Sequence, residues 1–209
     1  HTLGAAVVVA DLGLDLQLPL NFLSRAEIGA DGAATVFFRD RDPATPSVYT
    51  VRGYRRAAGS STFTSELTPL TNLNSPFRFC SAGNAAGDVV FSFDERFTNM
   101  FGTFDRVRHV YRDAETGFTA VSDTSASGFL PNIDSCAISS NGDALIMVVN
   151  SNLPSAVFVP IQYLDGVAST GGALTVPVSV TGSRPQGSMA TGGLGAVSYF
   201  RNDERVEVA

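Results

Sequence analysis

The chain lacks lysine and tryptophan, and it contains only two cysteines and two histidines in 209 residues. All fourteen basic residues are therefore arginine, and with twenty acidic residues the net charge is −6. Binding to nucleic acid generally needs a basic stripe or patch. The charge balance therefore disfavours nucleic acid as a partner.

Long apolar runs and helical patterning are also missing. The longest apolar candidate, Ala5 to Ala10, falls far short of the roughly twenty residues of a membrane-spanning helix. No segment repeats apolar residues at spacings of three and four, as an amphipathic helix would. A hydrophobic content of 44% with 16% charged residues instead fits a folded, strand-rich domain. We expect one all-β domain over residues 1–209, without a membrane span.

A short motif that combines a small residue, an Asp or Asn and a glycine recurs before an apolar strand. Its turn glycines, Gly32, Gly87 and Gly142, follow one another at intervals of 55 residues. The strands after them are 35–38, 90–93 and 145–148, and a degraded copy runs from Gly192-Gly193 into 196–200. Glycine next to Asp or Asn before alternating apolar residues is typical of a tight hairpin turn. The repeat therefore predicts the same hairpin four times.

Each hairpin is followed by a polar loop and a third strand, and the first three copies continue into a fourth strand. Pro76 and Pro131 each precede their turn glycine by eleven residues and mark where a new unit begins. Four antiparallel strands in about fifty residues are typical of a β-propeller blade. We expect units at 19–75, 76–130, 131–184 and 185–209, with an additional amino-terminal strand within 1–18.

The best-preserved unit runs from 108 to 150. Its strand ends in Arg112-Asp113, a Thr116-Gly117 turn follows, and Val121-Ser122 precedes the Ile138 to Gly142 hairpin. This pattern resembles the repeat of bacterial TolB-like, WD-like β-propellers. The resemblance implies a propeller and transmits no activity, since that fold supports many functions.

The two ends of the chain leave two arrangements open. In one, Ala5 to Asp11 completes the last blade and closes a ring of four units, which removes exposed sheet edges. In the other, the chain is a piece of a longer propeller, because relatives of this type usually carry six or more blades. The first residue is His1 rather than Met, which suggests processing and an exported protein.

Cys80 and Cys136 occupy matching first strands of neighbouring units, seven and six residues before their turn glycines. Adjacent blades approach most closely at these strands, so a disulfide is geometrically feasible if the Cα atoms lie within about 7 Å. The alternative is two buried free thiols. Two cysteines alone make a poor metal site.

Polar residues follow the second strand of each unit and are expected to form a rim around one mouth of the ring. Carboxylates, amides and guanidinium groups in such a rim can hold a sugar, a peptide terminus or a cation. The alternative is ordinary solvated loop with local ion pairs. The candidate rim consists of Arg39, Asp40, Asp42, Asp94, Glu95, Arg96, Asn150, Asn152, Arg201, Asn202 and Asp203.

Other residues have plain structural interpretations. Asp31, Asp88, Asn141 and Asp143 repeat, but they lie at turns, where such side chains bond to the backbone. The sequence has no G-x-S-x-G motif that would supply a nucleophilic serine for a catalytic triad with His109, so a structural or surface role is favoured. Strand alternation places Val107 on the same face as His109 and Arg108 on the opposite face.

The loop from Phe97 to Phe104 is longer than its counterparts. Its apolar residues, Phe97, Met100, Phe101 and Phe104, form a candidate partner-docking patch.

The sequence thus predicts a β-propeller that serves as a non-catalytic recognition or assembly module without a cofactor or metal. We expect an extracellular, periplasmic or surface location and a protein or glycan partner. Two alternatives are a glycan-active propeller hydrolase or lyase that uses rim carboxylates, and a structural subunit of a homo-oligomer, particle or filament.

Overall fold

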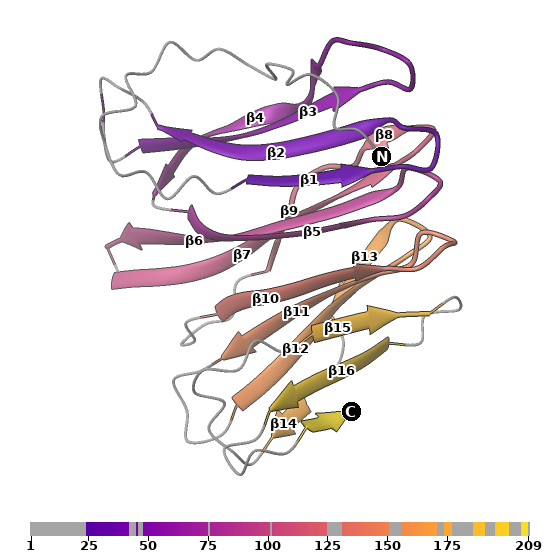
Figure 1. The fold of residues 1–209 in the computed structure, drawn as a ribbon. Coiled ribbons are helices and arrows are strands. Elements are labelled where there is room, and N and C mark those ends of the chain that lie inside the picture. Colours follow the sequence, from indigo (N-terminus) through magenta and orange to yellow (C-terminus); the bar gives the residue numbers. More distant parts are fainter. Residues whose placement is uncertain are drawn as a thin grey trace.

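A computed structural model of the chain describes residues 24–41, 45, 48–74, 76–100, 102–124, 131–150, 156–170, 174–176, 186–190, 195–200 and 206–208. These residues form β-strands joined by turns, arranged in four antiparallel sheets (Figure 1). Each sheet begins as a meander in which consecutive strands pair, and in the second and third sheets the last strand pairs back with the third strand. The described strands of each sheet fall within one expected repeat unit. The all-β fold class is therefore confirmed.

The first sheet contains β1 (Ser24–Ile28), β2 (Ala34–Arg41), β3 (Val48–Arg56) and β4 (Thr64–Asn74). The second contains β5 (Pro76–Gly83), β6 (Val89–Asn99), β7 (Gly102–Asp113), β8 (Gly117–Phe118) and β9 (Ser122–Thr124). The third contains β10 (Pro131–Ile138), β11 (Ala144–Asn150), β12 (Ala156–Leu164), β13 (Val167–Thr170) and β14 (Leu174–Val176). The fourth contains β15 (Gln186–Met189), β16 (Gly195–Phe200) and β17 (Val206–Val208).

The turn between the first two strands is built identically in the first three sheets. Gly32, Gly87 and Gly142 all have positive φ, and each donates its backbone N–H to the residue three positions earlier. Glycine adopts this backbone conformation without the steric cost of a Cβ atom. The 55-residue period is thus a repeated turn whose backbone only glycine adopts readily.

Strand lengths differ from those expected. The second and third strands of the second sheet extend to Asn99 and begin at Gly102, so they absorb most of the predicted loop from Phe97 to Phe104. The single fourth strand expected in that sheet is instead split into β8 and β9, which both pair with β7. The third sheet is similar, with β13 and β14 both paired to β12.

The sheets stack face to face, and two apolar cores fill the spaces between the first three. Between the first and second sheets, the rings of Phe37 and Phe91 stack with centroids 4.0 Å apart. Between the second and third sheets, Val90 and Tyr111 pack against Ile146 and Tyr163. Successive residues of a strand face opposite sides of the sheet. The second sheet therefore contributes to both cores.

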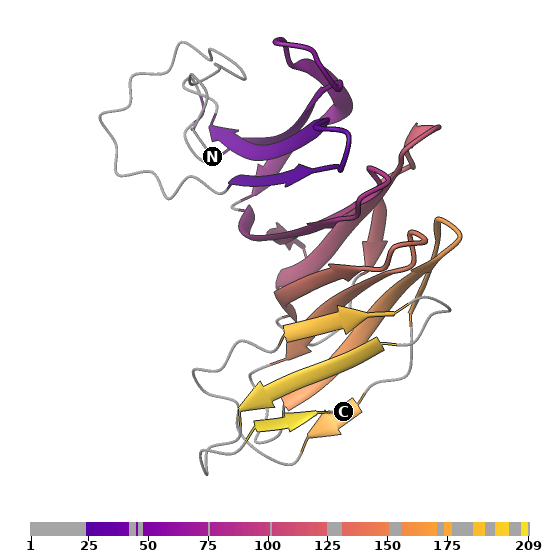
Figure 2. The same cartoon turned by 45° about the vertical axis from the view of Figure 1, so that its right-hand side comes forward.

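Figures 1 and 2 place the first sheet at one end of the stack and the fourth at the other. The described residues form an open arc, and the expected four-unit closed ring is not present among them. The amino-terminal strand proposed to close that ring, Ala5 to Asp11, lies outside the described residues.

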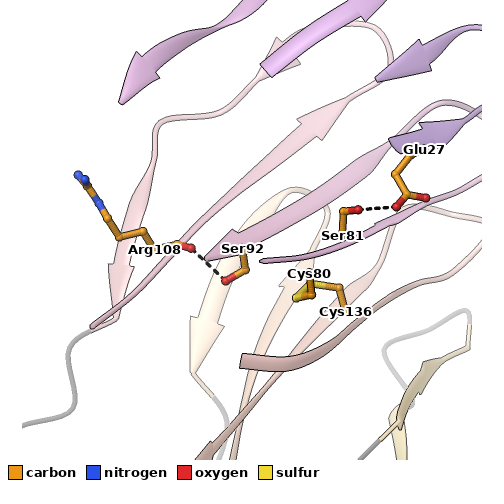
Figure 3. Close-up of a disulfide and its surroundings, with 6 residues drawn as sticks. All are labelled: Glu27, Cys80, Ser81, Ser92, Arg108 and Cys136. Atoms are coloured by element: carbon orange, nitrogen blue, oxygen red, sulfur yellow. Dashed lines mark hydrogen bonds between the residues drawn. A yellow bond between two sulfur atoms is a disulfide. The ribbon is translucent and has the colours of Figure 1, made fainter. Parts of the chain in front are cut away.

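A disulfide joins Cys80 of β5 to Cys136 of β10, with 5.5 Å between the two Cα atoms (Figure 3). It links the first strands of the second and third sheets, as the matching repeat positions allow. Disulfides persist in oxidising compartments. The bond indicates an extracytoplasmic location.

Removing this disulfide should lower stability substantially. The bridge spans 56 residues of sequence, and the chain-entropy relation gives about 4 kcal/mol for a loop of that size. We expect the double variant Cys80→Ser/Cys136→Ser to lose about this much unfolding free energy in urea titrations. Reduced wild-type protein is the matched control and should show the same loss. A loss of unfolding free energy below about 1 kcal/mol would contradict the idea that the disulfide stabilises the protein by constraining the unfolded chain.

Candidate functional site

The predicted rim residues that the structure describes lie near one side of the stack, where β2, β6 and β11 end (Figure 1). They lie within strands and not in loops. Arg39 and Asp40 belong to β2, Asp94 to Arg96 belong to β6, and Asn150 ends β11. The strands are longer than expected because each second strand keeps its pairing with the third strand through these polar residues.

Five predicted rim residues, Asp42, Asn152, Arg201, Asn202 and Asp203, lie outside the described residues, as does Phe101 of the predicted patch.

Two rim carboxylates occupy the same repeat position, and both are paired with arginine from the adjacent third strand. Asp40 accepts a hydrogen bond of 2.6 Å from Nε of Arg52. Glu95, at the equivalent position in the second sheet, accepts a hydrogen bond of 3.0 Å from Nε of Arg106. Both carboxylates are buried. These side chains are committed to ion pairs within their own sheets.

The pair in the second sheet belongs to a larger polar cluster. Arg106 also donates from Nη1 to Asp123 of β9, at 2.7 Å, and Nη1 of Arg108 lies 3.8 Å from Oε2 of Glu95. Sequence reasoning identified Glu95 and missed its partners. The sequence does contain a signal for these partners. Arg52 lies diagonally across the strand pair from Asp40, and Arg108 lies diagonally across from Glu95, which holds the same repeat position as Asp40.

Asp94 and Arg96 flank Glu95 but face the other side of β6. Asp94 is fully buried and accepts a hydrogen bond of 2.7 Å from the backbone N–H of Arg78, whereas Arg96 is exposed. Burial of Asp94 inside a strand contrasts with the solvated loop position that the sequence suggested. The structure therefore separates the three consecutive rim residues.

The β6–β7 hairpin extends beyond its neighbours in the second sheet. Pairing with β5 ends at Glu95, and pairing with β9 ends at Val107, whereas β6 and β7 continue to pair up to Asn99 and Gly102. Phe97 and Phe104 are register partners in this extension, which we call the hairpin tip, residues 96–100 and 102–105. Met100 lies at the turn and is 90% exposed.

His109 is buried at the seam between the second and third sheets, and Val107 and Tyr111 on its side of β7 belong to the same core. Its Nδ1 lies 2.6 Å from the hydroxyl of Tyr163, which also hydrogen-bonds with Ser122. Burial lowers the pKa of His109 to about 4, although the charge of Asp123 opposes this shift. His109 is therefore neutral at pH 7 and has the structural role favoured from sequence.

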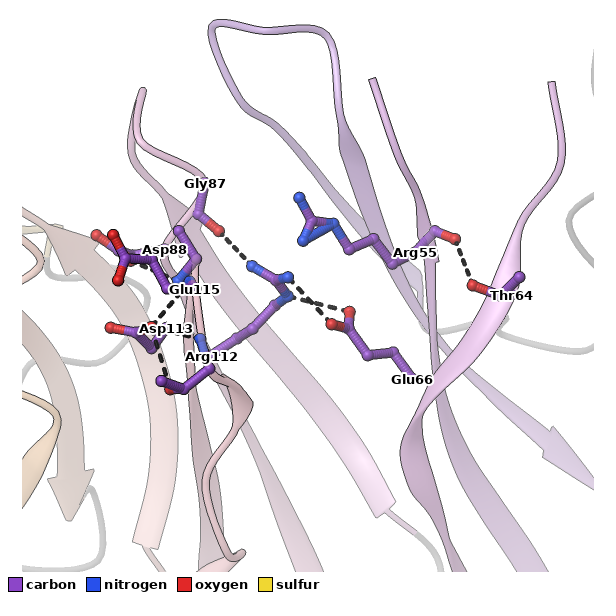
Figure 4. A network of polar contacts seen from close by, with 10 residues as sticks. Arg55, Thr64, Glu66, Gly87, Asp88, Arg112, Asp113 and Glu115 are labelled. Atoms are coloured by element: carbon purple, nitrogen blue, oxygen red, sulfur yellow. Dashed lines mark hydrogen bonds and ion pairs between the residues drawn. The ribbon is translucent and has the colours of Figure 1, made fainter. Parts of the chain in front are cut away.

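Arg112 joins the second sheet to the first (Figure 4). Its Nε and Nη2 each donate a 3.0 Å hydrogen bond to the carboxylate of Glu66 in β4, and its Nη1 donates to the carbonyl of Gly87. Arg112 is only 2% exposed. Burial raises the pKa of Glu66, and the nearby charge of Arg55 opposes that rise.

The repeated acidic residues serve their turns, as predicted. Asp31 accepts a hydrogen bond from the N–H of Ala33. Asp88 accepts hydrogen bonds from the N–H of Ala114 and from Nδ2 of Asn84, which also donates to the carbonyl of Ser139, so these contacts join three turns. In the described ranges, no three His, Cys, Asp or Glu side chains are grouped so that they could hold a metal ion. The described residues also include no helix that is long and apolar enough to cross a membrane.

No protein-family model matches the chain, and no curated protein matches it. Among solved structures, it is similar to a protein of unknown function from Dyadobacter fermentans DSM 18053, with 14% identity and a TM-score of 0.49. The match covers 88% of this chain and 50% of that protein, so this chain spans about half its length. Similarity at this level assigns neither a family nor a function.

Stability should fall on acidification because His109 is buried in its neutral form. Below pH 6.5 the unfolded chain binds a proton at this histidine, whereas the folded chain does so only near pH 4. We expect up to about 3 kcal/mol of unfolding free energy to be lost as the pH falls across that interval.

The variant His109→Gln isolates this contribution because glutamine can accept a hydrogen bond without titrating. Urea titrations at a series of pH values should show a shallower decline for the variant than for the wild type. Parallel declines would show that carboxylates alone cause the acid sensitivity.

Breaking the pair between Arg112 and Glu66 should weaken the seam between the first two sheets. Removing one partner of a buried ion pair costs about 3 kcal/mol, because the other charge stays buried. We expect that loss for Glu66→Leu and a smaller combined loss for Glu66→Leu/Arg112→Leu, measured by urea denaturation. Strictly additive losses would contradict a direct pair.

Proposed function

We propose that this chain is part of a β-propeller and that it works as a non-catalytic recognition or assembly module of an exported or surface protein. The propeller assignment is supported by the repeated meander, by the identical turns at 55-residue intervals, and by cores between successive sheets. Propellers bury each sheet against the next around an axis. The disulfide supports the extracytoplasmic location.

The observation that carries the recognition role is the hairpin tip. It extends past both neighbouring strands and places Met100, the most exposed large apolar side chain of the described residues, at its end. Methionine is flexible and polarizable, and it adapts to varied apolar partners. A hairpin that projects from a rigid sheet presents such a side chain without ordering a long loop.

A binding role also fits the state of the rim acids. Asp40 and Glu95 are buried and ion-paired with arginines of their own sheets, and the partly exposed arginines, Arg52 and Arg106, form a fixed polar surface above them. A protein or glycan partner would meet this surface beside the apolar tip. Interfaces commonly combine an apolar centre with a polar rim.

The proposal is tested by probing the chain against two immobilised collections, a glycan panel and a display library of random peptides. We expect the wild type to enrich a set of ligands, and Met100→Asp to weaken their binding by about tenfold or more. Ile28→Asp is the matched control, because Ile28 is an exposed apolar residue at the end of β1, and it should bind normally.

Two results would overturn the proposal. One is the absence of enriched ligands in both collections, and the other is equal binding by the wild type and Met100→Asp. Release of soluble sugar from the glycan panel would instead support the hydrolase or lyase alternative.

A further inference from the structure

We propose that the seam between the second and third sheets binds an arginine side chain of a protein partner, at the end where the turn glycines lie. Four carboxylates of the two sheets lie close enough to the Tyr111 hydroxyl for their charges to act on it. They belong to Asp88, Asp113, Asp143 and Asp165. This end of β6 and β7 is opposite to the hairpin tip, so the site is separate from the recognition surface proposed above.

Tyr111 forms the base of the site. It is only 3% exposed, and it contacts two turns of the third sheet. A Cβ atom added to Gly142 would come within 2.5 Å of the hydroxyl, and one added to Gly166 would come within 3.8 Å of the ring. In the described part of the chain the hydroxyl has no hydrogen-bond partner, and the enclosed polar atoms that lack a partner do not include it. The oxygen can therefore accept a hydrogen bond from a bound cation.

The carboxylates approach this hydroxyl from the turns of both sheets. The Cβ atom added to Gly142 would also come within 3.1 Å of Oδ2 of Asp88. Asp143 follows Gly142 directly, and Asp165 is exposed at the turn between β12 and β13. Asp113 lies on the same face of β7 as the tyrosine. The hydroxyl therefore lies where turns of the second and third sheets meet.

The charges of this cluster are not balanced by arginine. Asp88, Asp113 and Asp165 form no ion pair with the residues that the structure describes. Arg112, next to Asp113 in sequence, lies on the other side of the second sheet, where it binds the first sheet (Figure 4). Burial raises the pKa of Tyr111, and the four carboxylates raise it further. Their combined negative potential favours a bound cation.

The seam between the first and second sheets shows which kind of cation fits. Arg55 pairs with Thr35, three residues after the turn glycine of the first sheet. Tyr111 pairs with Val90, three residues after the turn glycine of the second sheet. Arg55 therefore holds in the first sheet the position that Tyr111 holds in the second. It reaches across its seam, where it lines a small cavity together with Asn84 of the second sheet.

The acidic positions change in the opposite sense between the two seams. Three of the four hold alanine in the seam that contains Arg55. They are Ala33, Ala57 and Ala114, which correspond to Asp88, Asp113 and Asp165. One seam thus has its own guanidinium group and one acid, whereas the other has four acids and a neutral phenol. We therefore expect the second of these seams to take its guanidinium group from a partner.

A guanidinium group also suits the spacing of the carboxylates better than a metal ion does. Among the described residues, no three acidic side chains are grouped so that they could hold a metal. A guanidinium group presents five N–H donors in a planar fork, so it can bond to more than one carboxylate and to a hydroxyl at once. Arginine is also enriched at interfaces between proteins.

Binding is measured by fluorescence anisotropy at low ionic strength, because salt screens exposed charges. The probe is a labelled peptide of glycine and serine that contains two adjacent arginines. Its matched control carries citrulline in place of both arginines, which keeps the shape of the side chain and removes its charge. We expect the arginine peptide to bind about tenfold more tightly or better, since charge-assisted hydrogen bonds are the stronger ones.

Variants of the site test which groups hold the peptide. Tyr111→Phe keeps the ring and removes the hydroxyl, and it should weaken binding by about fivefold. Asp165→Asn removes one exposed charge and should weaken binding by about threefold. Glu115→Gln is the matched control, because Glu115 is an exposed acid of the neighbouring turn whose charge does not act on Tyr111, and it should bind normally. Circular dichroism and melting temperature confirm that the variants fold.

A second measurement locates the bound peptide. The amide signals of ¹⁵N-labelled protein are followed by nuclear magnetic resonance during a titration with the arginine peptide. Gly142 and Gly166 should shift, because they contact Tyr111. Gly32 and Gly59, which lie in turns of the first sheet, should not shift.

Several results would overturn the proposal. They are the absence of binding, equal binding of the arginine and citrulline peptides, unchanged affinity in both Tyr111→Phe and Asp165→Asn, an equal loss in Glu115→Gln, and shifts confined to other turns. Spermidine tests a small organic cation as the occupant, and tighter binding of spermidine than of the peptide would also overturn the assignment to a protein partner.

The test is independent of the recognition role proposed for the hairpin tip. Met100→Asp should bind the arginine peptide as the wild type does, because Met100 lies at the opposite end of the β6–β7 pair. Failure of the arginine site leaves the ligands of the tip unaffected, and the reverse also holds.

Discussion

The structure depends on sheets that are apolar on both faces. In β6, Phe91 and Phe93 face the first sheet, whereas Val90 faces the third, and all three are almost completely buried. A sheet of this kind cannot stand in water with either face uncovered, because each buried aromatic side chain contributes several kilocalories per mole to stability. Stacking is therefore obligatory, and each sheet fixes the position of the next.

Polar contacts across the seams add specificity to this packing. One position of the third strand is held by Arg112 at one seam and by Tyr163 at the next, and each reaches back to the preceding sheet. The residue type changes, but the geometry persists, because the repeated turn sets the register of every hairpin. The disulfide adds a covalent link at the first strands of one seam.

Function is expected where the repeat is broken. The β6–β7 hairpin is longer than the surrounding pairing requires, and Arg56 donates to its turn glycine through Nη2 where Arg112 uses Nη1. Both departures occur on strands that otherwise obey the periodic pattern. A regular scaffold makes such departures visible, since every position has equivalents for comparison.

Much of the site could not be predicted, since its residues meet only through cross-strand register and packing. The sequence indicated that Asp40 and Glu95 lie near one side of the stack, but not that they are buried and paired with Arg52 and Arg106. It left the cysteine pair open between a bridge and two thiols. The predicted loop at Phe97 proved to be largely strand, because cross-strand pairing continued where composition suggested a break.

The sequence by itself determined the repeated turns at Gly32, Gly87 and Gly142 and the all-β class, because glycine at a positive φ and alternating apolar residues are local requirements. It also placed Val107 and His109 on one face, since alternation is a property of any strand. Only the tertiary structure decided the open arc, the disulfide and the pairing of Arg112 with Glu66. Those depend on distances between residues that are dozens of positions apart, which are set by how the sheets stack.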